Sequence, residues 1–340
     1  MPAAEAAPAS LPAGRAAGAR LAPFAAHAHV LLAVSGGPDS TALMLLAARW
    51  RDETGAATRL SVATVDHGLR AEARAEAEAV GRLAAGLGMS HAVLALAAPL
   101  SGARLQEAAR HARYERLAAH ARSIGASAIA TAHTQDDQAE TVLFRLMRGS
   151  GLTGLTGMAP ARALADLVLL RPLLGCAKAE LVALCREQGV AFAEDPSNQN
   201  PRFARVRLRR LMPVLADEGL DAARLARLAA RLRRADEALE AATDEAAARP
   251  GVALEGGVLD RAGFLALPEE IALRLLGRLV EQRGEGPVEL AKLEALLAWM
   301  RALPAQDGGA RTLAGALVRL SPRRVSIRRA PARRWPAAHF

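Results

Sequence analysis

The sequence predicts an α/β protein, with a parallel sheet covered by helices on both faces and a smaller, mainly helical domain after it. Three observations support this fold class. Between about residues 28 and 192, short β-like runs alternate with amphipathic helical patterns, which is typical of a parallel sheet. After about residue 215 the pattern changes to long helices rich in Leu, Ala and Arg. The chain has 340 residues, 51% of them hydrophobic, which is enough for two ordinary domains.

The first half is expected to alternate strands with helices. The strand candidates are His29–Val34, Leu60–Val65, His91–Leu96, Ala126–Ala132 and a weaker run at Leu167–Leu170. The helix candidates are Thr41–Arg49, Ala71–Leu87, Leu105–Ile124, Asp136–Arg148 and Ala177–Gln188. Open parallel sheets bind ligands outside the carboxyl ends of their strands, so the residues directly after each strand are the first candidates for a site.

The second half is expected to begin after a polar, arginine-rich loop from Glu194 to Arg210. The helix candidates that follow are Asp221–Ala248, Glu269–Glu281 and Val288–Leu303. The alternating segments Ala316–Leu320 and Val325–Ile327 flank Ser321-Pro322, which suits a turn, so we expect the domain to end in a β-hairpin.

These patterns divide the chain into three parts. Residues 1–20 are low in complexity and are expected to be mobile. Residues 21–215 form the α/β domain, and residues 216–340 form a helical, basic domain.

Composition excludes several classes of protein. The best early apolar run, Val30–Val34, stops at Ser35, far short of a membrane span. Residues 1–20 lack the apolar core of a signal peptide. The two cysteines, Cys176 and Cys185, provide neither a disulfide framework nor four zinc ligands. We therefore expect a cytoplasmic protein without a membrane partner.

The charge of the chain is uneven. Its formal net charge is +9, and residues 308–340 carry eight arginines and no acid. A basic surface favours a polyanionic partner such as nucleic acid. A solvated surface shaped by codon usage is the alternative, since only Lys178 and Lys292 among the 44 cations are lysines.

The first strand end with chemical content is Ser35-Gly36-Gly37-Pro38-Asp39-Ser40. Its two glycines let backbone N–H groups approach an anion closely, and Asp39 and Ser40 fall where a helix N-terminus favours phosphate. The string therefore predicts a phosphate-binding loop, against the alternative of an ordinary turn capped by Asp39 or Ser40. It is not a Walker A loop, because neither lysine follows a glycine at the required spacing.

Two further strand ends carry acids. Asp66 follows the second strand and suits either a nucleotide contact or a turn. In the segment His133–Thr141, Asp136, Asp137 and Glu140 share the first turns of a helix and form an anionic face. Such a face can hold Mg²⁺ or a substrate ammonium, whereas helix capping is the structural alternative.

As an ordered set, these strings and three others resemble the tRNA(Ile)-lysidine synthetase family, within the PP-loop ATP pyrophosphatase superfamily. The segments that carry the resemblance are Ser35–Ser40, Asp66–Arg70, Ala109–Tyr114, His133–Thr141, Arg171–Leu174 and Asp195–Asn198. Together they cover about residues 28–215. The family commonly has Asn where this chain has Val206, which leaves the role of that position open.

The resemblance implies ATP-dependent ligation of free L-lysine to C2 of the wobble cytidine of CAU-anticodon isoleucine tRNA, through an adenylated cytidine. ATP and Mg²⁺ are the implied cofactors, with Mg²⁺ held by Asp39 through ATP. The implied ATP-binding residues are Ser35, Gly36, Gly37, Pro38, Asp39, Ser40, Asp66, Arg110 and Arg113. The implied lysine-binding residues are His133, Asp136, Asp137 and Glu140, and the catalytic ones are Asp39, His133, Asp137 and Glu140. The implied tRNA-binding residues are Asn198, Arg202, Arg205 and Arg207.

Two other functions stay open from the residues alone. A PP-loop tRNA thiolase would use catalytic cysteines or an iron–sulfur cluster, and the two cysteines here suit apolar packing better. A non-catalytic RNA-binding protein would explain the basic tail but has no use for the anionic face at the ligand edge. The sequence does not determine the oligomeric state, and a homodimer also stays open.

Overall fold

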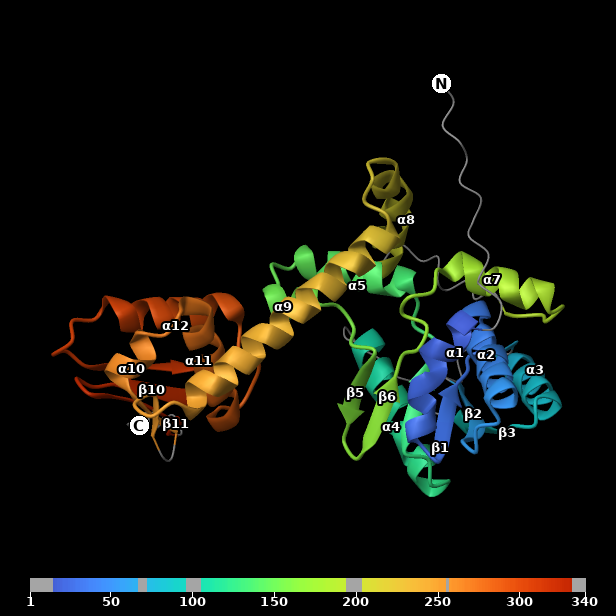
Figure 1. Ribbon diagram of the computed structural model, residues 1–340, viewed down its shortest axis with the longest axis horizontal. Coiled ribbons are helices and arrows are strands. Elements are labelled where there is room, and N and C mark those ends of the chain that lie inside the picture. The colour runs from blue at the N-terminus through green and yellow to red at the C-terminus, as the bar shows by residue number, and fades with distance from the viewer. Residues whose placement is uncertain (1–14, 67–71, 96–104, 194–203, 255–256, 332–340) are drawn as a thin grey trace, which may run out of the picture. The chain divides into compact units, whose positions relative to one another are not determined.

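The computed structural model describes the whole chain except residues 1–14, 67–71, 96–104, 194–203, 255–256 and 332–340 (Figure 1). It consists of two compact units. Unit 1 comprises Met1–Arg148 and Gly157–Ala229, and unit 2 comprises Gly149–Thr156 and Ala230–Phe340. The 27-residue helix α9 (Ala222–Ala248) passes from one unit into the other, so the units divide inside a helix rather than at residue 215.

Unit 1 is built on a six-stranded sheet with the order β3-β2-β1-β4-β6-β5, in which every neighbouring pair is parallel except β5 with β6. Its strands are β1 (His29–Ala33), β2 (Arg59–Asp66), β3 (Ser90–Ala95), β4 (Ala128–Thr131), β5 (Ala161–Leu164) and β6 (Leu167–Leu170). Its helices are α1 (Arg15–Leu21), η1 (Ala22–Ala26), α2 (Pro38–Thr54), α3 (Glu72–Gly86), α4 (Leu105–Ser123), α5 (Gln135–Leu146), α7 (Lys178–Glu187) and α8 (Ala204–Asp217). The predicted α/β class is confirmed.

Helices cover both faces of this sheet because the side chains of the central strand alternate between two cores. Val30 and Leu32 of β1 belong to the core that includes α2, α3 and α7. Leu31 and Ala33 belong to the opposite core, which includes α4. All five residues of β1 are buried, as expected for a strand covered on both faces.

Several elements of unit 1 were not expected, and α1 and β5 are two of them. Residues 15–20, within the stretch predicted to be mobile, form most of α1, because Leu21 and Phe24 anchor this segment in the core and the Phe24 ring meets Trp50 edge-on at 5.6 Å. The antiparallel strand β5 is mostly exposed, so its sequence carries no clear alternation that would reveal it.

The arginine-rich loop predicted from Glu194 to Arg210 is wrong in its second part, where α8 begins at Ala204. Val206 and Leu208 of α8 are both buried, and Leu208 packs in a core with α5 and α9. Arginines surround these two positions and mask the helical period in the sequence. Residues 194–203 lie outside the described part of the chain.

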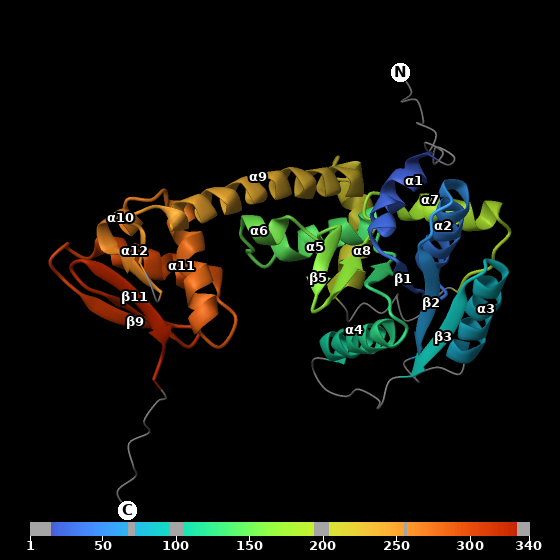
Figure 2. The same cartoon turned by 60° about the horizontal axis from the view of Figure 1, so that its bottom comes forward.

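Unit 2 packs helices on one face of an antiparallel sheet with the order β7-β8-β11-β10-β9 (Figure 2). Its strands are β7 (Ala253–Leu254), β8 (Val258–Asp260), β9 (Gly309–Leu313), β10 (Ala316–Leu320) and β11 (Arg324–Arg329). Besides most of α9, its helices are α6 (Leu152–Leu155), α10 (Arg261–Leu265), α11 (Glu269–Arg283) and α12 (Leu290–Ala302). The predicted hairpin is confirmed as β10 and β11, which pair with Leu320 opposite Val325, and it belongs to a larger sheet.

Within the described ranges, no helix combines the length and the apolar character that crossing a membrane requires.

Candidate active site

The loop between β1 and α2 is a tight, internally bonded turn. Gly36 has φ +86°, a conformation that a side chain disfavours. The Ser40 hydroxyl donates to the Gly37 carbonyl at 3.0 Å and accepts from the Ser35 amide at 3.2 Å. Pro38 occupies the first turn of α2, where its missing N–H costs nothing. The loop therefore aims the N-terminus of a 17-residue helix at the carboxyl edge of the sheet.

Asp39 lies in the first turn of α2 and is largely buried. Its Oδ2 accepts a hydrogen bond from Lys178 Nζ at 2.7 Å, while its Oδ1 is buried and has no hydrogen-bond partner within the described part of the chain. Burial raises the pKa of Asp39 above its usual value; the Lys178 ammonium opposes this shift, and Asp137 and Asp136 add to it. A carboxylate oxygen without a protein partner at this position fits a cation held jointly by Asp39 and a bound polyphosphate.

The first turn of α5 presents the acidic face that the sequence predicts. Thr134 and Asp137 form a capping box, in which Asp137 Oδ2 accepts from the Thr134 amide at 2.9 Å and the Asp137 amide donates to the Thr134 hydroxyl at 3.3 Å. Asp136 Oδ2 accepts from the backbone amide of Lys178 at 2.8 Å. Capping thus takes one oxygen of Asp137, and Asp136 joins the N-termini of α5 and α7.

Glu140 is the most buried carboxylate of this group, with a side chain only 2% exposed. It makes a two-pronged ion pair with Arg209 of α8, at 2.6 Å from Nε to Oε1 and 3.1 Å from Nη2 to Oε2. Burial raises the pKa of Glu140 above its usual value, although Arg209 acts in the opposite direction. The Arg209 side chain itself is 47% exposed, so it stays accessible to a ligand despite the ion pair.

These groups line one cavity of about 360 Å³ inside unit 1. The lining residues are Thr134, Asp136, Asp137, Glu140, Lys178, Arg209, Met212, Pro213, Ala216 and Ala222. Carboxylates and cations make up one wall, and apolar side chains of α8 and the start of α9 make up the other. This combination of size and lining suits a small zwitterion with an aliphatic chain.

Basic groups and a histidine lie beside this cavity. His133 follows β4, with Nδ1 2.9 Å from the Thr131 hydroxyl. Burial is the main cause that lowers the pKa of His133 to about 4; Asp137 opposes this, while Arg171, Arg110 and Arg113 add to it. The ring is therefore neutral at pH 7 and faces a cluster of guanidinium groups on α4 and after β6.

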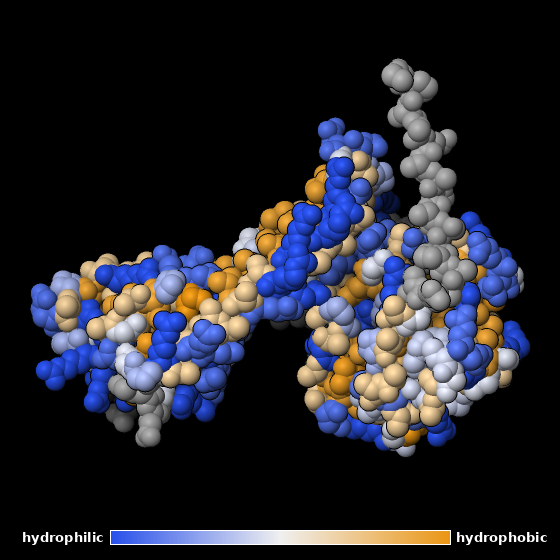
Figure 3. Space-filling view, in the orientation of Figure 1, coloured by the Kyte–Doolittle hydropathy of each residue, from blue (hydrophilic) through white to orange (hydrophobic). Residues whose placement is uncertain are grey.

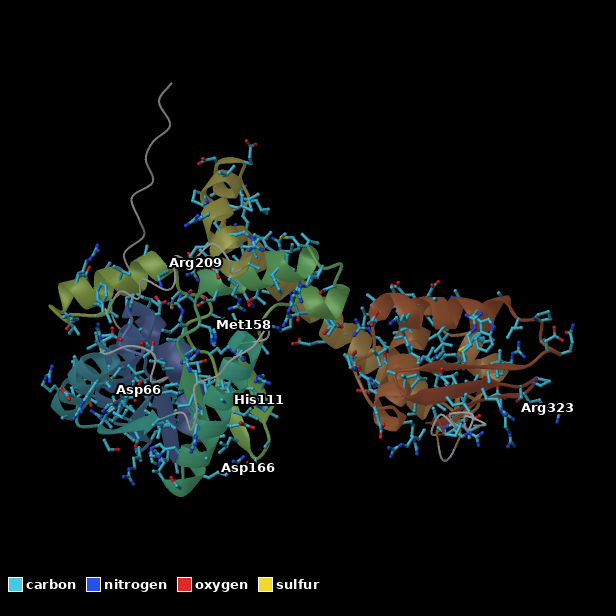
Figure 4. The ribbon with its side chains drawn as sticks, turned by 180° about the vertical axis from the view of Figure 1, so that it is seen from behind. Asp66, His111, Met158, Asp166, Arg209 and Arg323 are labelled. Atoms are coloured by element: carbon cyan, nitrogen blue, oxygen red, sulfur yellow. The ribbon has the colours of Figure 1, made fainter. Side chains whose placement is uncertain are left out.

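The remaining predicted site residues are placed as follows. Asp66 is half-buried at the end of β2, in unit 1 with Arg209 (Figure 4). Arg205 and Arg207 are exposed on α8, and Arg207 lines a second groove that also contains Phe144. Asn198 and Arg202 lie outside the described residues. Strand ends β1, β2 and β4 are neighbours in the sheet, so the structure brings the three predicted motifs to one edge.

Two residues of this site were not predicted to belong to it. Lys178 lies 139 positions from Asp39, and Arg209 was grouped with the basic loop rather than with Glu140, 69 positions away. The only signal for Lys178 was that it is one of two lysines in the chain. Among the described residues, no group of three or more His, Cys, Asp and Glu side chains could hold a metal ion.

Known proteins resemble this chain in sequence and in fold. A family model described as a PP-loop domain matches residues 15–215. The tRNA(Ile)-lysidine synthase of Methylobacterium nodulans is 54% identical over 90% of this chain and 91% of that protein, and the enzyme of the same name from Bradyrhizobium sp. (strain BTAi1) is 50% identical over 92% and 93%.

Solved structures extend the likeness in fold. The U34-tRNA thiolase NcsA from Methanococcus maripaludis superposes with a TM-score of 0.54 at 15% identity, over 64% of this chain and 78% of that one. At this identity the likeness concerns the fold alone.

Proposed function

The chain belongs to the tRNA(Ile)-lysidine synthase family, and from this premise we propose its reaction and the residues that carry each step. The enzyme joins free L-lysine to C2 of the wobble cytidine in the CAU anticodon of isoleucine tRNA, so that the tRNA reads AUA and is charged with isoleucine. The cytoplasm, where tRNA is used, is the compartment we propose.

ATP is needed because the C2 oxygen of cytidine is a poor leaving group. In the first step this oxygen bonds to the α-phosphorus of ATP, the bond from that phosphorus to the bridging oxygen breaks, and pyrophosphate departs. In the second step the ε-nitrogen of lysine bonds to C2, the C2–O bond breaks, and AMP leaves with the oxygen. One proton must leave the attacking ammonium before its nitrogen can act as a nucleophile.

The adenylation step is assigned to the loop Ser35–Ser40 and its surroundings. The N-terminus of α2 attracts the phosphates of ATP, and the glycines allow their close approach. Asp39 would hold Mg²⁺ through its Oδ1, which has no partner among the described residues, and Mg²⁺ neutralises charge on the departing pyrophosphate when it is bound. Asp66 would contact the nucleoside from the neighbouring strand end.

Arg110 and Arg113 of α4 are assigned to the phosphates of ATP. Both guanidinium groups influence His133, which follows the adjacent strand β4, so they lie close to the ligand edge. Arginine suits phosphate because its planar fork donates two parallel hydrogen bonds. Arg110 also lies over the Tyr114 ring at 5.3 Å, which orients the side chain.

The cavity between α5 and α8 is assigned to the substrate lysine. Its acidic wall, Asp136, Asp137 and Glu140, suits the two amino groups of lysine, and the exposed side of Arg209 suits the carboxylate. Met212 and Pro213 offer an apolar surface to the four-carbon chain. One observation carries this proposal: a cavity of a size that suits a zwitterion lies beside the phosphate loop. Lys178 lines the cavity and contacts Asp39 of the loop, and the carboxylates in the first turn of α5 line the cavity and act on the pKa of Asp39.

We assign a carboxylate, rather than His133, as the base that accepts the proton of the ε-ammonium. With a pKa of about 4, His133 is a weak base and serves better as a neutral hydrogen-bonding group that orients the nucleotide. Glu140 is charge-paired with Arg209 and buried, which suits binding. Asp137 lines the cavity and acts on the pKa of both His133 and Glu140, and only its Oδ2 receives capping bonds, so it is the better candidate for the base.

The tRNA is assigned to the basic surfaces of both units. Hydrophilic and hydrophobic side chains are interleaved over α8 (Figure 3), where Arg205 and Arg207 are exposed beside the exposed apolar Leu211 and Val214. Such a surface suits phosphates and unstacked bases. Asn198 and Arg202 precede this helix and remain predicted tRNA contacts.

A thiolase reaction is less well supported. Cys176 and Cys185 are both fully buried, and burial raises the pKa of each thiol, to about 11 for Cys185. A catalytic cysteine needs the opposite environment, which is accessible and stabilises the thiolate.

The test is mass spectrometry of nucleosides from CAU-anticodon isoleucine tRNA after incubation with the enzyme, ATP, Mg²⁺ and L-lysine, with lysine omitted in a parallel reaction. Lysidine that forms only when lysine is present is the expected result. Production of AMP and pyrophosphate without lysidine would favour another nucleophile such as sulfide, and no ATP turnover would favour a binding protein.

A further inference from the structure

Lys178 occupies a position that the proposed reaction has not yet used. Its ammonium contacts Asp39 in the phosphate loop at 2.7 Å, and its side chain also lines the cavity that contains Glu140 and Arg209. The side chain is 47% exposed, so the ammonium is accessible to a ligand. Lys178 is therefore an accessible cation shared by the loop and the cavity.

The backbone around Lys178 is held firmly in place. Its own amide donates to Asp136 Oδ2 at 2.8 Å, and two residues earlier the Cys176 carbonyl accepts from the Gln135 amide at 2.9 Å. Glu180 closes the same turn by accepting from the Ala177 amide at 3.1 Å. The N-terminus of α7 is thus fixed to the N-terminus of α5, which directs the flexible lysine stem toward Asp39.

The choice of lysine at this position is informative. The chain contains 44 Lys and Arg residues, and 42 of them are arginine. Arginine makes fixed, planar contacts, as Arg209 does with Glu140, whereas lysine provides a compact charge on a flexible stem. A position that must release one anion and contact another is better served by lysine.

The charges around the loop indicate a role for Lys178. The loop that we assign to ATP phosphates contains the carboxylate of Asp39, with Asp136 and Asp137 nearby. A polyphosphate that enters such a site meets several like charges, which disfavours binding unless cations offset them. Lys178 is the cation in contact with Asp39, and it can turn from this carboxylate toward a phosphate without any movement of the backbone.

We propose that Lys178 is a phosphate-binding residue of the adenylation site, whose ammonium is held by Asp39 before ATP binds and contacts the β- and γ-phosphates afterwards. This inference rests on the proposed function, because it takes ATP as the ligand of the loop. Asp39 is then released to share the cation that accompanies ATP. Lys178 would also stabilise pyrophosphate as it leaves.

The test compares binding of two nucleotides in the presence of Mg²⁺ by isothermal titration calorimetry. The probes are α,β-methylene-ATP, which is not cleaved and carries all three phosphates, and AMP, which carries only the first. In Lys178→Met we expect binding of the ATP analogue to weaken at least about tenfold, as a lost charge-assisted contact predicts, and AMP binding to change less than about twofold.

The matched control is Lys292→Met. It removes the only other lysine, which is exposed on α12 and pairs with Glu289. Unchanged binding of the ATP analogue in Lys178→Met, or an equal loss for both nucleotides, would overturn the inference. Failure of the wild-type chain to bind the ATP analogue would overturn the proposed function and the inference with it.

A second measurement uses the wild-type chain and does not depend on how a variant folds. Acetylation of the two lysines is followed by mass spectrometry, and Lys292 is the internal reference. We expect α,β-methylene-ATP and inorganic pyrophosphate to slow acetylation of Lys178 severalfold, while AMP does not. Equal acetylation of Lys178 with and without these ligands would contradict the proposed contact.

Discussion

Four carboxylates at the ligand edge of unit 1 make four different contacts. Asp39 contacts Lys178, Asp136 accepts from the N-terminus of α7, Asp137 caps α5, and Glu140 is paired with Arg209. Because their surroundings differ, these residues are not interchangeable, and substitutions should separate their roles.

Glu140→Gln is expected to weaken the use of lysine strongly without lowering stability. The folded-state pKa of Glu140 is raised, so its contribution to the free energy of unfolding is present at low pH and is lost as pH rises through that pKa. At neutral pH the ionised carboxylate therefore adds no stability from this source. The neutral amide should leave the urea midpoint unchanged or higher. We expect kcat/KM for lysine to fall about 10- to 100-fold.

Urea unfolding and lysidine formation at varied lysine concentrations check this prediction. Glu53→Gln, which is exposed on α2 and paired with Arg49, is a control that should not change the KM for lysine. A Glu140→Gln protein with normal lysine kinetics would remove Glu140 from the lysine site.

His133 predicts a specific pH dependence of stability. Its folded-state pKa is about 4, below the ordinary 6.5, so the unfolded chain takes up a proton that the folded chain does not. The free energy of unfolding of unit 1 should fall as pH decreases from about 6.5 to about 4, by up to about 3 kcal/mol from this residue.

His133→Gln should remove this part of the pH dependence, as measured by urea unfolding at a series of pH values. His111→Gln, an exposed site on α4, is the control and should keep the full dependence. If His133→Gln and wild type lose stability in parallel, the histidine is not buried in its neutral form.

At the level of elements, α2 connects the core to the phosphate loop and has a glycine with positive φ at each end. Gly36 precedes it with φ +86°, and Gly55 follows it with φ +64°. A Cβ atom at Gly36 would lie 3.5 Å from Val80, whereas nothing lies within 4 Å of one at Gly55. Both glycines thus adopt a left-handed backbone conformation, at opposite ends of the same helix.

Gly36→Ala and Gly55→Ala should each cost about 1 kcal/mol in the free energy of unfolding, because alanine disfavours a left-handed backbone. Only Gly36→Ala should also weaken ATP binding, since only that glycine shapes the phosphate loop. Thermal unfolding and nucleotide titration of both variants check this. Equal ATP affinities in the two variants would show that the loop does not bind the phosphates.

Local patterns in the sequence predicted some elements well and others poorly. The capping residues Thr134 and Asp137 predicted the start of α5, because a cap depends on neighbours three positions apart. The first part of α8 was missed because its helical state depends on burial of Val206 and Leu208, and burial is a tertiary property. Strand β5 was missed for a related reason, since it pairs with β6 but buries little.

At the level of the whole molecule, tRNA binding should depend steeply on salt. In unit 2, Arg319, Arg324 and Arg328 lie on the face of the sheet opposite the buried side chains of β10 and β11 and are exposed. Replacing all three with Gln should reduce the slope of log K against log salt by about 2 to 3, because each phosphate contact contributes about 0.7 to 0.9.

Filter binding of tRNA over a salt series measures this slope. Arg122→Gln is a control that should leave it unchanged, since Arg122 is already neutralised by Asp166 at 2.7 Å in the last turn of α4. An unaltered slope in the triple variant would exclude this sheet face from the tRNA interface.

The candidate site itself was predictable only in part. Short strings predicted the loop Ser35–Ser40 and the acidic turn of α5 as parts of the candidate site, because each motif is local in sequence. The pairs Asp39 with Lys178 and Glu140 with Arg209 join residues 139 and 69 positions apart, and only the fold brings them together. Arg209 could not be assigned to this site from the sequence, because its sequence neighbours are other arginines, and such a run indicates RNA binding.

We propose that the phosphate loop adenylates the tRNA and that the neighbouring cavity supplies lysine. Exchange of labelled pyrophosphate into ATP, measured with CAU-anticodon isoleucine tRNA and without lysine, isolates the first step. We predict that Asp39→Asn loses this exchange, whereas Glu140→Gln retains it while forming little lysidine. Loss of exchange in Glu140→Gln, or normal exchange in Asp39→Asn, would contradict this division between loop and cavity.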